Sequence, residues 1–173
     1  MNLNLILSLV ALCVLASGQT TGDRSSVYKS PDRKLRAVVI TGATGESQID
    51  IQASPGRVLL RRDERSNDGS HGHGIVQAAW TSDSQFFIAS TSASGGHQPW
   101  ARSLWVYSRS KNRVFELWKF GITATTDFKL KPPDIVLTTA LGCDSDNNPR
   151  PIAFRLYQLV STGRITAAPC PNQ

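Results

Sequence analysis

A polar turn that ends in Asp and leads into a hydrophobic run occurs twice in this chain, 51 residues apart. Ser30-Pro31-Asp32 precedes the run at 35–40, and Thr81-Ser82-Asp83 precedes the run at 86–90. Each copy is followed by two further strand-like runs. A period of this length is typical of stacked four-stranded sheet units. The sequence therefore predicts an all-β fold of antiparallel meanders.

The pattern between the turns supports the same fold. Short β-branched and aromatic runs alternate with turn residues, and no helical period is convincing after the N-terminus. Residues 48–52 alternate strictly between polar and apolar side chains, as expected for a half-exposed strand. Strands are predicted at residues 36–41, 48–52, 58–61, 75–80, 85–90, 103–108, 114–118, 135–140 and 151–159.

The N-terminus has the pattern of an export signal. Residues 5–16 are apolar apart from Ser8, and Ala16-Ser17-Gly18 offers small residues for cleavage. The apolar run is shorter than the ~20 residues of a membrane-spanning helix, although a retained membrane anchor is the alternative. We expect residues 1–18 to be a cleaved signal peptide and residues 19–173 to form a single β domain. The protein would then be exported to a periplasmic or extracellular space.

The chain has a net charge of +6 and a pI near 9.6, which raises the question of an anionic partner. The basic residues are scattered, and no block holds five or more of them. A solvated surface is the simplest interpretation. Weak attraction to anionic extracellular polymers comes second, and a nucleic acid partner is the least favoured.

The two turns also carry a resemblance. Ser30-Pro31-Asp32 and Trp80-Thr81-Ser82-Asp83, each with its following strand, resemble the blade signature of bacterial β-propeller repeats of the TolB-like and WD40-like families. The resemblance covers about two blades, residues 30–118, with a divergent third out to Val160. It implies two to three blade-like, four-stranded units. A closed propeller needs at least ~4 blades of ~40 residues, so a partial propeller, an open sheet or a sandwich is expected.

Two glycine-rich loops hold all three histidines. His71 and His73 lie within residues 69–74, and His97 and Trp100 lie within residues 94–100. Three converging imidazoles could bind Zn or Cu, but the flanking glycines favour structural or surface histidines. Asp144 opens a calcium-loop-like segment that lacks the required Gly and Glu, which favours a polar turn. No metal or other cofactor is expected.

Two further pairs of residues have alternative interpretations. Trp105 and Tyr107 fall on one face of their strand, and Trp118 follows on the paired unit. These side chains would form a stacking platform for sugar rings or peptide side chains if exposed, and ordinary core if buried. Cys143 and Cys170 could form a disulfide in an oxidising compartment, or they could remain free thiols. Trp100, in its loop, has the best chance of exposure among the tryptophans.

The leading functional hypothesis is an exported, non-enzymatic binding or scaffold module. Its partner would be an envelope protein or an extracellular polymer, contacted through the two glycine-rich loops. A hydrolase using His71, His73 and His97 is one alternative; no catalytic residue is assigned, because a trio such as Ser94, His97 and Asp83 needs geometry to support it. Self-association through open sheet edges, giving a homo-oligomer, is another alternative.

Overall fold

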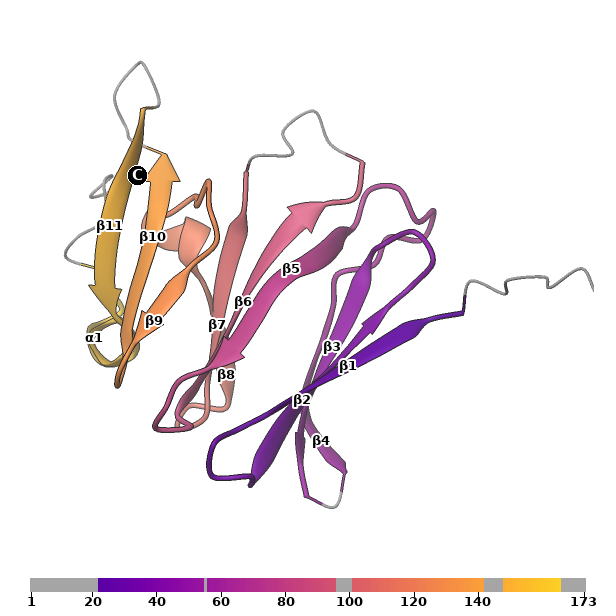
Figure 1. Cartoon of the computed structure of the whole chain (residues 1–173), viewed down its shortest axis with the longest axis horizontal. Coiled ribbons are helices and arrows are strands. Elements are labelled where there is room, and N and C mark those ends of the chain that lie inside the picture. Colours follow the sequence, from indigo (N-terminus) through magenta and orange to yellow (C-terminus); the bar gives the residue numbers. More distant parts are fainter. Residues whose placement is uncertain (1–21, 55, 96–100, 142–147, 166–173) are drawn as a thin grey trace, which may run out of the picture.

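The computed structural model describes residues 22–54, 56–95, 101–141 and 148–165, which form three antiparallel sheets. The sheets stand beside one another as a stack, with the N-terminal sheet at one end (Figure 1). The all-β fold of antiparallel meanders is confirmed, and the two four-stranded sheets are compatible with blade-like units. No helix within the described ranges is long and apolar enough to cross a membrane.

Consecutive strands are hydrogen-bonded neighbours in every sheet. The first sheet contains β1 (Arg24–Lys29), β2 (Leu35–Thr41), β3 (Ser47–Ala53) and β4 (Arg57–Asp63). The second sheet contains β5 (His73–Trp80), β6 (Phe86–Ala93), β7 (Ser103–Ser108) and β8 (Arg113–Glu116). The third sheet contains β9 (Lys129–Lys131), β10 (Ile135–Leu141) and β11 (Pro149–Arg155), and the short helices are η1 (Leu117–Phe120) and α1 (Leu156–Thr162).

The second sheet is buried on both faces, which explains why its strands are so apolar. Successive side chains of a strand point to opposite faces. Phe87 and Trp105 therefore pack toward the first sheet, with Leu35, Ile49 and others. Their strand neighbours, including Phe86, pack toward the third sheet and the two short helices. The two hydrophobic clusters hold the three sheets together.

The two turns that end in Asp32 and Asp83 make the same hydrogen bonds. The Ser30 hydroxyl donates to Asp32 Oδ1 at 2.7 Å, and the Thr81 hydroxyl donates to Asp83 Oδ1 at 2.6 Å. Each hydroxyl also accepts from the backbone N–H at the start of the following strand. The turns thus fix where β2 and β6 begin.

Each of these Asp residues also contacts the next sheet along the stack. Arg109, in the turn between β7 and β8, donates to Asp32 Oδ2 at 2.6 Å. The Tyr157 hydroxyl of α1 donates to Asp83 Oδ2 at 2.6 Å. The hydrogen bonds from Arg109 and Ser30 hold the pKa of Asp32 well below its usual range, despite the opposing effect of burial.

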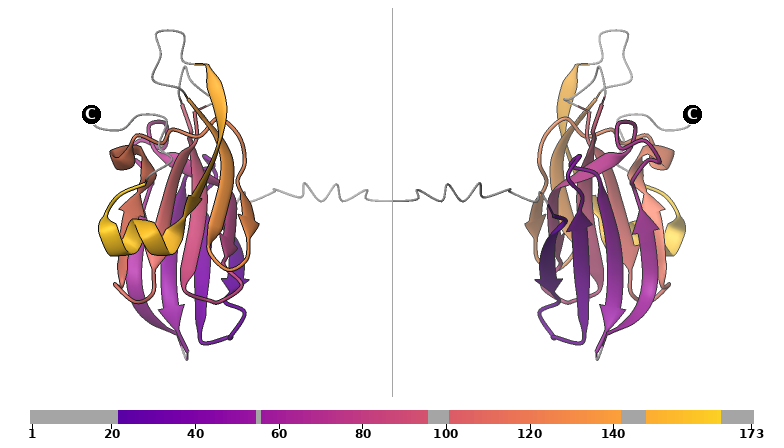
Figure 2. Two further views of the ribbon diagram at one scale, coloured as in Figure 1. Left: turned by 90° about the vertical axis from the view of Figure 1, so that its left-hand side faces the viewer. Right: turned by 90° about the vertical axis from the view of Figure 1, so that its right-hand side faces the viewer.

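The outer face of the first sheet mixes exposed apolar residues with hydrogen-bonded polar ones. Val27 and Val58 are exposed on it. Asp50 is buried and accepts two hydrogen bonds from Arg61, at 2.7 and 2.8 Å. The Arg61 guanidinium lowers the pKa of Asp50 against the effect of burial. Figure 2 shows this face at the end of the stack.

The structure corrects the predicted elements at several places. The strand β1 was missed, because only one apolar residue of its length, Val27, marks it strongly. The short strand β9 was also missed, and the predicted strand at 114–118 ends at Glu116, where η1 follows. The third sheet has three strands rather than four. The predicted strand at 151–159 ends at Arg155 and is followed by α1, whose buried residues Leu156 and Leu159 have helical spacing.

Candidate functional site

The two loops expected to bind a partner contact each other. The loop between β4 and β5 lies beside the start of the loop after β6, where the backbone N–H of Ser94 donates to Gly72 O at 2.9 Å. The Ser94 hydroxyl also contacts Gly72 O, at 3.1 Å. The sequence brings them together because β5 and β6 are adjacent antiparallel strands, so that one loop precedes β5 and the other follows β6 at the same end of the sheet.

A buried carboxylate, that of Glu46, forms hydrogen bonds with both loops. It lies in the turn between β2 and β3 and is 1 % exposed. Its Oε1 accepts from the Gly72 backbone N–H at 2.6 Å and from the Ser94 hydroxyl at 2.7 Å. Its Oε2 accepts from the Ser66 backbone N–H at 2.7 Å. One side chain therefore joins three loops from two sheets.

The electrostatics of Glu46 follow from these contacts. Burial alone would raise the pKa of its carboxyl. The hydrogen bonds donated by Ser94, Ser66 and Gly72 stabilise the charged form and outweigh burial, so the pKa is lowered to about 2. The Glu46 side chain is therefore a charged carboxylate at neutral pH.

Close backbone approach explains two of the loop glycines. A Cβ at Gly72 would lie 2.4 Å from Glu64 O and 2.5 Å from Glu46 Cδ. A Cβ at Gly95 would lie 2.1 Å from Ser70 O. Only glycine lets the two loops pack this closely.

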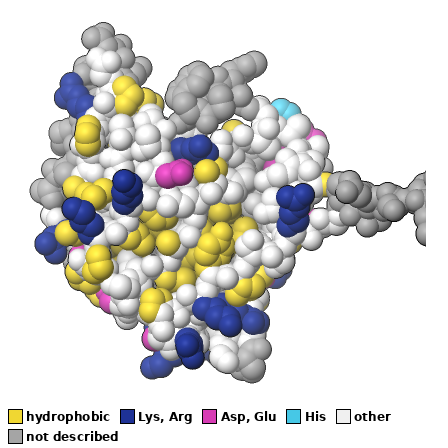
Figure 3. Space-filling model, viewed as in Figure 1, with side chains coloured by type: hydrophobic (Ala, Val, Ile, Leu, Met, Phe, Trp, Pro, Cys, Tyr) yellow, Lys and Arg dark blue, Asp and Glu magenta, His cyan; other side chains and the backbone are white. Residues whose placement is uncertain are grey.

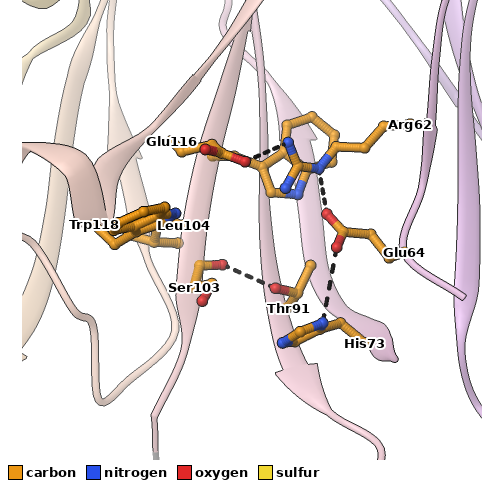
Figure 4. A pocket seen from close by; sticks show the side chains of 9 residues that line it. Arg62, Glu64, His73, Thr91, Ser103, Leu104, Glu116 and Trp118 are labelled. Atoms are coloured by element: carbon orange, nitrogen blue, oxygen red, sulfur yellow. Dashed lines mark hydrogen bonds and ion pairs between the residues drawn. The ribbon is translucent and has the colours of Figure 1, made fainter. Parts of the chain in front are cut away.

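A pocket of about 360 Å³ opens next to these loops, between the first and second sheets (Figure 4). The ends of both loops contribute to it: Glu64 and His73 flank the first loop, and Thr91 and Ser103 flank the second. We call this cavity the Arg62 pocket. It is lined by Arg62, Glu64, His73, Thr91, Ser103, Leu104, Trp105, Glu116 and Trp118.

Arg62 is the central charge of the pocket. Its guanidinium forms ion pairs with Glu64 and, at 2.9 Å, with Glu116. It also stacks on Trp105, with 5.4 Å between the guanidinium carbon and the ring centroid. Glu116 pairs in turn with Lys119 at 2.5 Å. The hydrogen bonds from Lys119 and Arg62 lower the pKa of Glu116 against the effect of burial, so this carboxyl is not suited to donate a proton near neutral pH.

Trp118 lies at the pocket and is largely exposed, and the Lys119 ammonium lies over its ring, 5.2 Å from the centroid. The Trp118 side chain belongs to η1, and the residue is 56 % exposed. In Figure 4 it lies beside Leu104, across the opening from Glu64 and His73. An exposed tryptophan at a concave site is unusual for a structural role, because large aromatic side chains are mostly buried.

The three predicted histidines have different outcomes. His73 lines the pocket, with its Nδ1 3.8 Å from Glu64 Oε2. His71 is exposed and does not line it; its Nδ1 contacts Asp68 Oδ2 at 2.6 Å and the Ser70 hydroxyl at 3.1 Å. His97 lies outside the described residues, as do Trp100, Cys143 and Cys170, so the predicted disulfide is also outside them.

Of the two interpretations of Trp105 and Tyr107, the structure supports burial in the core and not an exposed stacking platform. Each is 1 % exposed, and both pack against the first sheet. Neither can therefore stack on a ligand at the outer surface. Trp105 still reaches the pocket as part of its lining.

The described contacts of His71 and Ser94 do not form a Ser-His-Asp arrangement. In a Ser-His-Asp triad, the serine and the carboxylate bind different nitrogens of the imidazole. Ser70 and Asp68 both contact Nδ1 of His71. Ser94 donates to Glu46, and it lies beyond the opposite end of β6 from Asp83. Within the described ranges, no three His, Cys, Asp or Glu side chains gather to hold a metal ion.

The sequence argument missed Arg62, Glu64 and Glu116 as pocket residues, whereas it had considered Trp118 as part of a stacking platform. The three missed residues lie at or next to the ends of β4 and β8, which are far apart in sequence.

One signal was available in the positions of the two glycine-rich loops. His73 lies in the first loop, and Thr91 and Ser103 lie three residues before and after the second loop; all three line the pocket. Comparison with known proteins adds no assignment, since neither a family model nor a curated protein matches this chain.

Proposed function

We propose that this chain is an exported, non-enzymatic binding module of partial-propeller type, and that it recognises an extracellular polymer at the Arg62 pocket and the loops beside it. One observation carries the proposal: both glycine-rich loops join residues that line the same pocket. Loops held on a rigid sheet scaffold are where binding sites are usually found.

The polymer is favoured over a folded protein partner by the shape and chemistry of the site. A pocket of this size accepts a single small unit of a larger molecule. Its lining combines an exposed aromatic ring with charged and hydroxyl groups, which together suit a polar, cyclic unit. Figure 3 shows Lys and Arg side chains dispersed over the face in view, so a purely electrostatic footprint is not supported there.

Binding rather than hydrolysis is favoured by the state of the acidic side chains. Both glutamates of the pocket are paired with Arg62. Hydrolysis of a glycosidic bond requires one carboxyl group that is protonated. The hydrogen bonds from Lys119 and Arg62 lower the pKa of Glu116, so this carboxylate can accept hydrogen bonds from a ligand but is a poor proton donor.

Self-association through the stack is a less favoured function. The outer face of the first sheet is occupied by the Asp50–Arg61 pair and its polar neighbours. Val27 and Val58 are exposed on this face, but Asp50 and Arg61 lie between them, so a second copy would meet a mixed surface and no continuous apolar patch.

Cosedimentation with purified insoluble polymers tests the proposal. Cellulose, chitin, mannan, pectate and peptidoglycan are each incubated with the wild-type protein and with Trp118→Ala and His73→Ala. The control is Val76→Ala, which alters an exposed residue outside the pocket. We expect at least one polymer to retain the wild type and the control, and to retain both pocket variants less. Retention of no polymer, or equal retention of all four proteins, would refute the proposal.

A further inference from the structure

The charges that line the Arg62 pocket are balanced within the protein. Arg62 pairs with both glutamates, and Lys119 pairs with Glu116. A ligand with a full charge would have to compete with these pairs, and it would lose its hydration on entering. An uncharged ligand does not compete with these pairs, and its loss of hydration costs less than that of a charge.

The same groups offer many hydrogen-bonding positions. The glutamate carboxylates can accept, the Arg62 guanidinium can donate, and the Ser103 hydroxyl can do both. The Thr91 hydroxyl donates to Ser103 O at 3.3 Å. His73 contributes a ring nitrogen besides the one near Glu64. Figure 4 shows these groups arranged around one opening, and they come from the strands β4 to β8 and the loop after β4. A ligand that carries several hydroxyl groups around a ring would match this arrangement.

One side of the opening is apolar. Trp118 is exposed there, and Leu104 lies beside it. The face of a pyranose ring has C–H groups that pack on an aromatic ring, while its equatorial hydroxyls point outward. The pocket therefore has an apolar wall for the ring face and polar groups for the ring edge.

A buried donor at the pocket adds a separate observation. The indole N–H of Trp105 is buried and has no hydrogen-bond partner. A buried donor without a partner destabilises the protein, and an acceptor that reaches it removes this cost. Trp105 lines the pocket, so a hydroxyl group that enters deeply could supply the acceptor.

We propose that the Arg62 pocket binds an uncharged pyranose unit of a polysaccharide, with Trp118 stacking on the ring face and Glu64, Glu116 and His73 contacting its hydroxyls. This inference rests on the proposed function and narrows it to one ligand class. It also separates pocket binding from the weak attraction that a chain of net charge +6 has for any polyanion.

Calorimetry with soluble oligosaccharides tests the inference. The titrants are the hexasaccharides of glucose, mannose and N-acetylglucosamine, which are neutral, and hexagalacturonate, which is anionic. Titrations are run at about 0.15 M and about 1 M NaCl, where the Debye length is ~8 and ~3 Å. We expect saturable binding of at least one neutral hexasaccharide that changes little with salt. Trp118→Ala should weaken it about tenfold, as loss of one aromatic contact does, and Val76→Ala should leave it unchanged.

Three results would overturn the inference: no binding of any neutral hexasaccharide, neutral binding that Trp118→Ala leaves intact, or binding of hexagalacturonate alone. These failures are distinguishable from failure of the proposed function. If a charged polymer is retained in the cosedimentation assay and Trp118→Ala or His73→Ala reduces that retention, the pocket is a binding site for another ligand class. The melting temperature of each variant, measured in parallel, shows whether a loss of binding reflects unfolding.

Discussion

The contact between the two loops makes a sharp prediction at Gly72. In Gly72→Ala, the new Cβ would lie 2.4 Å from Glu64 O and 2.5 Å from Glu46 Cδ. An ordinary contact begins near 3.4 Å, so the loop backbone must move by about 1 Å. Overpacking of this kind costs ~1–3 kcal/mol. For a domain of this size, that lowers the melting temperature by roughly 2–12 °C.

Gly42→Ala is the matched control for this substitution. Gly42 lies in the neighbouring turn between β2 and β3, and its new Cβ would have its nearest contact at 3.7 Å. We expect its stability to stay within ~0.5 kcal/mol of the wild type. Both proteins are compared by thermal melting followed by far-UV circular dichroism, and by urea titration. If Gly72→Ala melts at the same temperature as Gly42→Ala, the loops do not pack as described and the argument for a joined site fails.

Further predictions concern Glu46, the core and the contact between the second sheet and α1. The pKa of Glu46 is lowered to about 2, so the carboxylate stabilises the fold above its usual pKa near 4.5, and this stabilisation is lost as the pH falls through 2. The difference in urea midpoint between the wild type and Glu46→Gln should therefore disappear as the pH falls from 4.5 to 2. Phe87→Ala, in the core between the first two sheets, should lower the free energy of unfolding by ~3–5 kcal/mol, whereas Val58→Ala, which is 42 % exposed, should have a small effect by urea titration. The hydrogen bond to Asp83 raises the pKa of Tyr157 to about 12, so Tyr157→Phe should remove a step near pH 12 from a spectrophotometric tyrosine titration, and Asp83→Asn should move that step to lower pH.

Much of the fold could be predicted from the sequence because its strands are short and clearly bounded. The turns at Asp32 and Asp83 fix the starts of β2 and β6, and the predicted strand at 103–108 coincides with β7. The alternation of apolar residues did not show that the second sheet has two buried faces. Residues 86–89 are apolar throughout, a pattern that indicates burial but does not say which sheet covers each face.

The site was harder to predict, because its residues converge only in three dimensions. The loops were identified from glycine and histidine content, and His73 does line the pocket. Arg62 and Glu116 are 54 residues apart in sequence, and each looks like an ordinary charged residue near a strand end. Only the packing of the first sheet on the second brings them within 2.9 Å. Glu46 was missed for the same reason, since its partners come from two other loops.

The most direct test of the Arg62 pocket as the ligand site is a titration followed by NMR of the tryptophan indole N–H signals. Trp118 and Trp105 line the pocket, whereas Trp80 donates its indole N–H to Tyr28 O at 2.8 Å within the core. With a soluble neutral hexasaccharide as titrant, the signals of Trp118 and Trp105 should shift and saturate together while that of Trp80 stays in place. A saturable titration in which the Trp118 and Trp105 signals do not move would contradict the assignment of the site.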